Sequence, residues 1–219
     1  MDLAAYDNAP RPTRPWVLAN MVTGIDGSVA IDGRTKQMSS EVDRALFHHL
    51  RTLADVILVG ATTVRDERYG PHRPTDGSAP KPIAVVSGSL RLDRESPFFT
   101  DAVARPIVVT SARSDPATRA RLAEIADVRV IGDARVDVGA AVRELGGVIL
   151  CEGGPSLLAE LLLADLLDEM CLTIAPIVGG DPGRIVGDSV TGHPMRFALG
   201  SVVEGDGDVF LRYLALRHR

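Results

Sequence analysis

The stretch LCEGGPSL at residues 150–157 joins an apolar strand, Val148 to Cys151, to an apolar helix that begins at Pro155. Its two glycines carry no Cβ, so the backbone can lie directly against a ligand. Pro155 suits the first position of a helix, where exposed N–H groups carry the positive end of the helix dipole. Such a corner binds phosphate or pyrophosphate well, and Glu152 places an acid beside it. The alternative is a purely structural Gly-Gly turn.

The same alternation of strand and helix runs through most of the chain. Short β-branched runs predict strands, and apolar residues at helical spacing, such as Val42, Leu46 and Leu50, predict helices between them. Ser39 or Ser40 is expected to cap the first of these helices. The predicted strands are residues 16–22, 56–59, 82–86, 106–109, 128–131, 148–151 and 170–175, and the predicted helices begin near residues 40, 115, 136 and 155.

The chain ends in a different pattern. Residues 195–203 and 208–216 flank Glu204-Gly205-Asp206-Gly207, which is typical of a β-hairpin. We therefore predict an α/β fold with a mixed, mainly parallel sheet flanked by helices and an antiparallel hairpin at its C-terminal end. Residues 1–13 are interpreted as an N-terminal extension and residues 14–219 as one domain.

Composition argues against several classes of protein. The 219 residues are 45% hydrophobic and 24% charged, which fits one globular domain. A net charge of -5 argues against a nucleic-acid partner or an acidic membrane surface. No apolar run approaches the ~20 residues of a membrane span, and residues 1–15 lack the apolar core of a signal peptide. Cys151 and Cys171 lie in apolar strands and are expected to be buried thiols of a cytoplasmic protein, not a disulfide or metal ligands.

Familiar cofactor motifs are absent from the sequence. It has no G-x-G-x-x-G, no P-loop, no G-x-S-x-G and no zinc-deaminase signature. Two corners that follow strands, residues 60–64 and 152–156, offer glycines and hydroxyls instead, and Ser87 and Thr110 also follow strands. Because ligands collect at the carboxyl ends of parallel strands, one extended ligand can cross all four. The long loop at residues 65–81 is a candidate substrate loop.

An ordered set of segments resembles a known family. The segments are residues 20–27 (NMVTGIDG), 50–51 (LR), 54–60 (ADVILVG), 63–64 (TV), 152–154 (EGG), 167–169 (LDE) and 175–176 (AP) through 179–180 (GG). In this order they resemble the reductase domain of bacterial riboflavin biosynthesis, and especially its stand-alone pyrimidine reductase relatives, over about residues 14–216. The resemblance implies a dihydrofolate reductase fold, NADPH as cofactor and a homodimer. It also implies hydride transfer to C1′ of 5-amino-6-(5-phosphoribosylamino)uracil or of the related diaminopyrimidine.

That reaction needs proton transfer, because the cyclic glycosylamine must open to an imine before C1′ accepts hydride. The acidic candidates are Asp26, Glu67 and Glu152. Asp26 and Glu152 each end a strand and are expected to face the same ribose. The alternatives are an Asp26 that bonds its own Asp-Gly turn and a Glu67 that is an exposed loop charge. The alignment of Asp66 against Glu67 can also shift by one residue, because Arg68 departs from the family pattern.

Two sets of ligand-binding residues follow from this interpretation. For the cofactor they are Gly60, Thr62, Thr63, Val64, Ser87, Arg91, Thr110, Gly153, Gly154, Pro155, Ser156 and Leu157, with Ser87 and Arg91 suited to a 2′-phosphate. For the phosphoribosyl-pyrimidine substrate they are Asn20, Asp26, Lys36, Ser39, Asp43, Glu67, Arg68 and Glu152. No metal site is expected.

Two other functions remain open. The chain is either a reductase of another heterocycle, such as dihydrofolate, or a dinucleotide-binding protein without catalysis. Asp43 lies near the position of the pterin-binding acid of dihydrofolate reductases, although an acid there also favours a helix N-terminus. The non-catalytic alternative predicts lost acids, whereas Asp26, Glu67 and Glu152 are all present.

Overall fold

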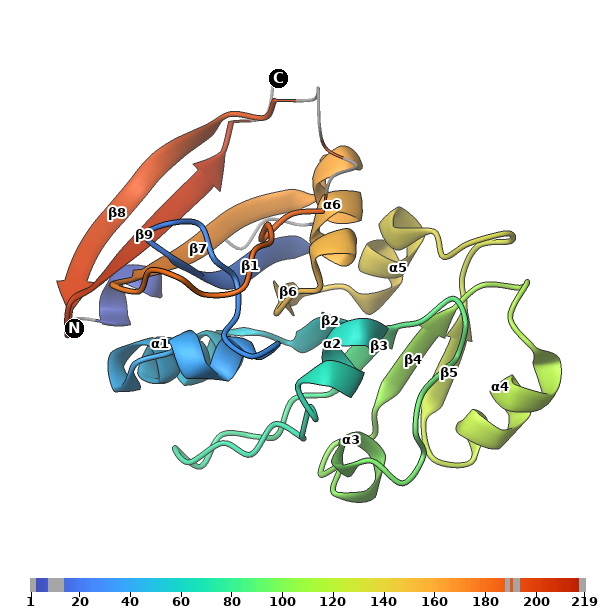
Figure 1. Ribbon diagram of the computed structural model, residues 1–219. Coiled ribbons are helices and arrows are strands. Elements are labelled where there is room, and N and C mark those ends of the chain that lie inside the picture. The colour runs from blue at the N-terminus through green and yellow to red at the C-terminus, as the bar shows by residue number, and fades with distance from the viewer. Residues whose placement is uncertain (1–2, 8–13, 188–189, 191–193, 217–219) are drawn as a thin grey trace.

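The computed structural model describes residues 3–7, 14–187, 190 and 194–216 (Figure 1). The strands are β1 (Trp16–Gly24), β2 (Val56–Gly60), β3 (Ile83–Val86), β4 (Ile107–Thr110), β5 (Asp127–Val130), β6 (Val148–Cys151), β7 (Leu167–Ala175), β8 (Phe197–Gly205) and β9 (Asp208–Ala215). The helices are α1 (Glu41–Leu53), α2 (Ala61–Asp66), α3 (Pro97–Thr100), α4 (Pro116–Ala123), α5 (Val138–Leu145) and α6 (Pro155–Leu163), with short 3₁₀ helices η1 (Leu3–Tyr6) and η2 (Thr35–Met38). None of the helices within these ranges is long and apolar enough to cross a membrane.

One sheet runs through the molecule in the order β5-β4-β3-β2-β6-β1-β7-β9-β8. The strands from β5 to β7 pair in parallel. The last two, β9 and β8, add an antiparallel ribbon beside β7. This is the predicted α/β architecture, including its C-terminal hairpin, and that prediction is confirmed. The parallel strands bring their carboxyl ends to one edge, where ligands bind in open α/β sheets.

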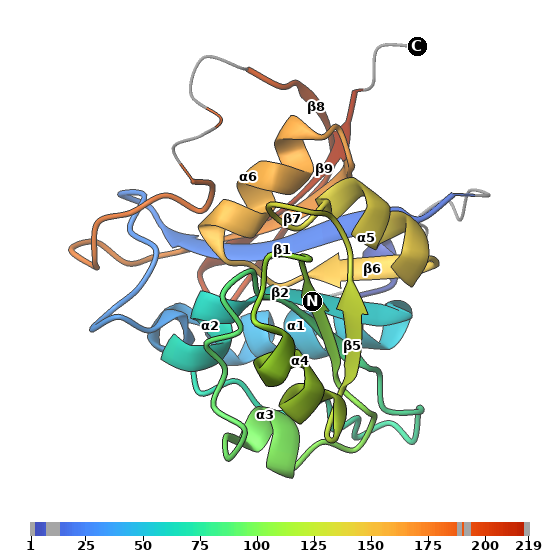
Figure 2. The same ribbon diagram turned by 90° about the vertical axis from the view of Figure 1, so that its right-hand side faces the viewer.

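Helices cover both faces of the sheet (Figures 1 and 2). Successive side chains of a strand point to opposite faces, so Val17 and Ala19 pack in one cluster with α5 and α6. Trp16 and Leu18 pack on the other face against Leu46 and Leu50 of α1. Full burial of each such apolar side chain contributes about 1.5–3 kcal/mol, and these clusters hold the strand ends in a fixed frame.

Local sequence signals predicted the start of α1 correctly, but they did not predict the helices α2 and α3. Ser40 caps α1, because its Oγ accepts a hydrogen bond from the Asp43 amide at 3.0 Å. The helix α2 was expected to be a turn, because its threonines and Val64 are weak helix formers. Packing of Val64 into the core, 5% exposed, offsets that weakness. The short α3 was also not predicted.

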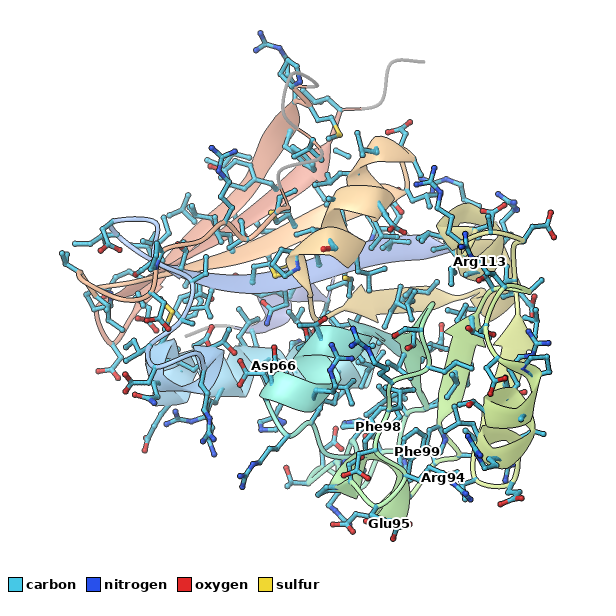
Figure 3. The ribbon with its side chains drawn as sticks, turned by 45° about the vertical axis from the view of Figure 1, so that its right-hand side comes forward. Asp66, Arg94, Glu95, Phe98, Phe99 and Arg113 are labelled. Atoms are coloured by element: carbon cyan, nitrogen blue, oxygen red, sulfur yellow. The ribbon has the colours of Figure 1, made fainter. Side chains whose placement is uncertain are left out.

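Two aromatic residues account for α3. Figure 3 shows Phe98 and Phe99 of α3, on the side of β3 and β4. Both are buried, and their rings meet edge to face with centroids 4.8 Å apart. They pack with Val85 and Val108 in the core beneath β3 and β4. The pair fixes the segment that follows β3, which lines the site described below.

Part of the expected N-terminal extension packs against the domain. Tyr6 is 1% exposed and lies in the cluster of Trp16 and Leu46. Residues 1–2 and 8–13 of that extension lie outside the described residues. The prediction of two buried thiols is confirmed, since Cys151 and Cys171 are both free and buried. Burial raises the pKa of Cys151 to about 12, which makes this thiol unreactive at neutral pH.

Candidate functional site

Two adjoining cavities lie at the carboxyl ends of the parallel strands. The first, here called the β3 cavity, has a volume of about 430 Å³ and lies beside residues 86–91, which follow β3. The second, the α1 cavity, has a volume of about 380 Å³ and lies between α1, α2 and the loop at Arg184. Both are lined by Thr62, Gly154 and Pro155, so they form one elongated site.

The glycine corner forms the boundary between the two cavities. Gly153 has φ +99° and Gly154 has φ +58°, a region that side chains other than glycine rarely adopt. The Gly60 amide donates to the Gly153 carbonyl at 2.9 Å, which ties the corner to the end of β2. A Cβ on Gly154 would lie 3.3 Å from Thr63 Oγ1. The backbone is therefore open to a ligand just before the N-terminus of α6.

Polar and cationic groups gather in the β3 cavity. Ser87 is 3% exposed, and its Oγ has no hydrogen-bond partner among the described residues. Arg65, Arg91 and Arg135 line the same cavity. The Arg65 guanidinium donates to the Arg91 carbonyl and to Thr62 Oγ1, at 3.2 and 3.1 Å. An unsatisfied buried hydroxyl among three arginines is suited to an anionic group such as a phosphate.

Glu67 lies in the α1 cavity and is held there by one oxygen. Its Oε1 accepts from the Thr35 amide at 2.8 Å and from Thr35 Oγ1 at 2.9 Å. No hydrogen bond reaches Oε2 from the described part of the chain. The carboxylate is therefore oriented while one oxygen stays available to a ligand. Asp66 lines the same cavity at the end of α2 that borders α1 (Figure 3).

Glu152 is engaged in a buried cluster with Arg51 and Tyr69. The Arg51 guanidinium donates from Nε to Oε1 at 2.6 Å and from Nη2 to Oε2 at 2.7 Å. Tyr69 donates its hydroxyl to Oε2 and accepts from Arg51 Nη2 at 2.8 Å. The side chain of Glu152 is 2% exposed and that of Arg51 is 8% exposed. Burial alone lowers the pKa of Arg51, but Glu152 and Tyr69 outweigh it and the pKa rises.

The structure corrects the placement of Asp26. Its Oδ1 accepts from the Ser28 amide at 2.9 Å, and its Oδ2 accepts from the Gly179 amide at 2.6 Å. These bonds, that to Gly179 foremost, lower the pKa of Asp26 to about 2. The residue lines neither cavity. The structure does not bring Asp26 and Glu152 together: Asp26 joins two surface turns, whereas the Glu152 carboxylate accepts from Arg51, and the catalytic role of each stays a prediction.

Four further predicted residues lie outside both cavities. Val64 is in the core, and Thr110 is fully buried with its hydroxyl donated to the Ser87 carbonyl at 2.8 Å. Lys36 and Arg68 are exposed and line neither cavity. The contacts of these four with cofactor or substrate stay predictions, and sequence order alone does not show which way a side chain points.

The other predicted residues do line the site. Those in the β3 cavity are Gly60, Thr62, Ser87, Arg91, Gly154, Pro155, Ser156 and Leu157. Those in the α1 cavity are Asn20, Ser39, Asp43, Thr63, Glu67, Glu152 and Gly153. The structure thus gathers residues from five stretches of the chain, at 20, 39–43, 60–67, 87–91 and 152–157, and their binding roles stay predictions.

Three arginines of the site were not predicted. Arg65 lies on the helix that was expected to be a loop, and Arg184 follows β7 in the α1 cavity. Arg135 follows β5 and reaches the β3 cavity. The signal for Arg135 was present in the sequence, because it follows a parallel strand just as Ser87 does. Phe47, one turn after Asp43 on α1, also lines the α1 cavity.

Comparison with known proteins agrees with this geometry. The model of the RibD C-terminal domain family matches residues 15–211. A curated relative from Methanothermobacter thermautotrophicus is 33% identical over 184 residues, covering 80% of this chain and 84% of the relative. That relative is named 2,5-diamino-6-ribosylamino-4(3H)-pyrimidinone 5′-phosphate reductase. The family resemblance inferred from the sequence is confirmed.

Solved structures give the same fold. A pyrimidine reductase-like protein from Corynebacterium diphtheriae superposes with a TM-score of 0.82 at 25% identity, covering 100% of this chain and 96% of that one. A dihydrofolate reductase from Enterococcus faecalis superposes with a TM-score of 0.57 at 12% identity, covering 91% of this chain and 96% of that one. The second likeness concerns the fold alone, which confirms the predicted dihydrofolate reductase fold.

Proposed function

Because the chain belongs to the RibD C-terminal domain family, we propose that it reduces a phosphoribosylamino-pyrimidine of riboflavin biosynthesis with NADPH. Hydride goes to C1′ and a proton from solvent goes to the exocyclic nitrogen, so the product is the ribitylamino compound. The observation that carries this proposal is the pair of cavities joined at the Gly153-Gly154 corner. A dinucleotide fits the β3 cavity and the corner, and a phosphorylated sugar with its ring fits the α1 cavity.

The residues present suit a nicotinamide dinucleotide. The corner offers backbone without side chains at the start of α6, which favours a pyrophosphate. Ser87 offers an unsatisfied hydroxyl, and Arg91 and Arg135 offer positive charge for a 2′-phosphate. NADPH supplies the hydride when it is bound.

We assign the proton transfer of this reaction to Glu67. Opening the cyclic glycosylamine moves a proton from the exocyclic nitrogen to the ring oxygen, which leaves an imine at C1′. A carboxylate with one free oxygen can carry that proton between the two atoms. Glu67 has this arrangement, whereas both Glu152 oxygens already accept from Arg51. We therefore propose Glu67 as the acid-base residue and Glu152 as a positioning residue.

The substrate phosphate needs a cation in the α1 cavity. Among the described residues that line it, the basic side chain is that of Arg184. Arg184 takes the place that the sequence had suggested for Lys36 and Arg68. This placement leaves the far end of the cavity, beside α1, for the pyrimidine ring.

Purified protein, NADPH and a set of candidate substrates test the proposal. The set contains the phosphoribosylamino-uracil, its 2-amino counterpart and dihydrofolate, and oxidation of NADPH is followed by absorbance. We expect turnover of a phosphoribosylamino-pyrimidine and none of dihydrofolate. Turnover of dihydrofolate alone would replace the proposed substrate class, and binding of NADPH without any turnover would support the non-catalytic alternative.

The glycine corner gives a prediction about cofactor binding. We expect Gly154→Ala to weaken NADPH binding at least about tenfold, because its Cβ would lie 3.3 Å from Thr63 Oγ1 and distort the corner that we propose for the pyrophosphate. The positive φ also adds about 1–2 kcal/mol of strain. Gly146→Ala is the matched control, since Gly146 has φ +67° and nothing lies within 4 Å of its Cβ. Equal NADPH affinity of the two variants in a fluorescence titration would contradict the assignment.

The positions of Arg91 and Arg135 lead to a prediction about the preference of the enzyme for NADPH over NADH. We expect Arg91→Ala and Arg135→Ala each to weaken NADPH binding about tenfold and to leave NADH binding within about twofold, because the lost partner is the 2′-phosphate. Arg113→Ala is the control: Arg113 is exposed on the neighbouring loop and lines neither cavity (Figure 3). Equal losses of affinity for NADPH and NADH would mean that these arginines contact a part of the cofactor other than the 2′-phosphate.

We also propose that the protein acts as a homodimer in the cytoplasm. The apolar strand at residues 170–175 lies within the sheet between β1 and β9, so it is covered on both edges. The exposed apolar side chains of Val178, Leu199 and Val202 offer more suitable surface. Light scattering at micromolar concentration distinguishes the dimer from a monomer.

A further inference from the structure

A buried histidine fastens the long loop that follows α2. His72 is 3% exposed, and its Nδ1 accepts a hydrogen bond from the Lys81 amide at 3.0 Å. The next residue, Pro82, stands just before β3, and its carbonyl accepts from the Ile57 amide of β2 at 3.1 Å. The imidazole therefore ties the loop to the fixed start of β3.

Both apolar and charged groups surround this ring. It lines a small cavity with Ile83 and Phe98, and a second cavity of about 200 Å³ between α1 and its own loop. The titratable and charged groups that act on it or share the second cavity are His48, His49 and Arg51 of α1, Glu152 after β6, and Arg73, Asp76 and Lys81 of the loop. Burial, and then the charge of Arg51, lower the pKa of His72, so the ring is neutral at neutral pH.

The hydrogen bond from Lys81 fixes which ring nitrogen carries the proton. A backbone amide only donates, so Nδ1 of His72 holds a lone pair and the neutral ring carries its proton on Nε2. A second proton can enter only at Nδ1. That proton sets one donor against another and breaks the bond to the Lys81 amide. The loop is therefore fastened only while the ring is neutral.

The same loop carries one member of the Glu152 cluster. Tyr69 stands three residues before His72 and donates its hydroxyl to Glu152 Oε2. The same hydroxyl accepts from Arg51 Nη2 at 2.8 Å. Glu152 in turn lines the α1 cavity. A movement of the loop at His72 thus reaches the wall of that cavity through Tyr69 and Glu152.

We infer that His72 is a positioning residue for the pyrimidine substrate, since its neutral ring holds the loop that orients Tyr69 and Glu152; this inference rests on the proposed function. The fastened loop has the lower His72 pKa and so binds fewer protons than the released loop. Acid therefore favours release, by up to about tenfold for each pH unit below about 6.5, the ordinary pKa of histidine. The loss appears in KM more than in kcat, because His72 does not touch the reacting atoms.

The test follows KM and kcat for the pyrimidine from about pH 7.5 to about pH 5.5 in the native enzyme and in His72→Asn. The asparagine Oδ1 replaces Nδ1 as the acceptor for the Lys81 amide but takes up no proton. We expect the ratio of native KM to variant KM to rise at least about threefold over this range, and the ratio of the kcat values to stay constant. The substrate phosphate, with a pKa of about 6, titrates equally with both enzymes and cancels in the ratio.

His49→Asn is the matched control. His49 lines the same cavity, but its Nε2 lies 2.7 Å from Asp7 Oδ1 and it forms no bond that fastens the loop. This variant should keep the native dependence of KM on pH. A KM ratio of native enzyme to His72→Asn that does not change with pH overturns the inference while the proposed reaction stands.

Hydrogen exchange of the Lys81 amide gives a readout that does not depend on activity. Its protection, corrected for the intrinsic effect of pH on exchange, should fall below about pH 6.5 in the native protein and stay constant in His72→Asn. Constant protection in the native protein overturns the inference. If His72→Asn does not fold, NMR of the native ring nitrogens decides: a proton on Nδ1 at neutral pH overturns the inference, and a proton on Nε2, with protection lost as the ring titrates, supports it. Absence of turnover with every candidate pyrimidine refutes the proposed function, and the exchange measurement still decides whether His72 holds the loop.

Discussion

Replacement of Glu67 by Gln is expected to lower kcat by about 10²–10⁴-fold, the range that positioned acid-base groups contribute. The glutamine keeps an oxygen that can accept both hydrogen bonds from Thr35, so the side chain should hold its position. It loses the ability to carry a proton between the exocyclic nitrogen and the ring oxygen. KM and NADPH affinity should change little, because an interaction made mainly in the transition state lowers kcat and kcat/KM together.

Asp66→Asn is the matched control for Glu67→Gln. Asp66 is the preceding residue, is exposed and lines the same cavity (Figure 3). Steady-state kinetics of both variants on the confirmed substrate also decide the alignment, which the sequence left open by one residue. A large loss in Asp66→Asn with normal turnover in Glu67→Gln would move the acid to Asp66. Normal turnover in both would show that catalysis here depends on positioning and hydride transfer alone.

The parts of the site that were predicted correctly depend on neighbours in sequence. A Gly-Gly-Pro after an apolar strand constrains its own backbone, and the corner has the expected positive φ angles. Ser40 caps α1 because its partner, the Asp43 amide, is three residues away. The alternation of strands and helices and the C-terminal hairpin also follow from local patterning.

The parts that were not predicted depend on partners far apart in the chain. Glu152 is held by Arg51 and Tyr69, which lie 101 and 83 residues away from it. No pattern within one segment shows that these groups meet. Asp26 illustrates the opposite case, because a local Asp-Gly turn was the recognised alternative. The Asp26 carboxylate bonds that turn and also the distant Gly179 amide.

The positions of Asp26, Glu67 and Glu152 differ from the arrangement that the sequence suggested. The sequence suggested three acids around a ribose, whereas the structure gives the three carboxylates separate hydrogen-bond partners. Asp26 links the turn after β1 to the loop after β7, Glu152 anchors the segment after α2 beneath the glycine corner, and Glu67 has an oxygen that faces the cavity. Glu152 itself lines the α1 cavity, and we propose that both anchors set the shape of this cavity.

The anchor at Glu152 predicts a loss of stability together with a loss of substrate binding. We expect Glu152→Gln to lower the free energy of unfolding by about 3–5 kcal/mol, because it leaves the buried Arg51 without its counter-charge. Urea denaturation measures this change. Since Glu152 precedes Gly153 and also holds Tyr69, the variant should show a raised KM for NADPH and pyrimidine, while kcat falls much less than in Glu67→Gln.

Glu169→Gln is the control for Glu152→Gln. It separates the effect of the Glu152 cluster on the site from the effect of losing a buried ion pair on stability. Glu169 and Arg212 form a second buried pair, with Oε1 and Nε 2.6 Å apart and the two side chains 2% and 9% exposed. This pair joins β7 to β9 and lines neither cavity. Its loss should cost a similar free energy of unfolding, about 3–5 kcal/mol, and leave both KM values unchanged. If Glu152→Gln instead keeps its stability and KM values but loses kcat, then Glu152 is a proton-transfer group, and the ion pair with Arg51 must open during turnover.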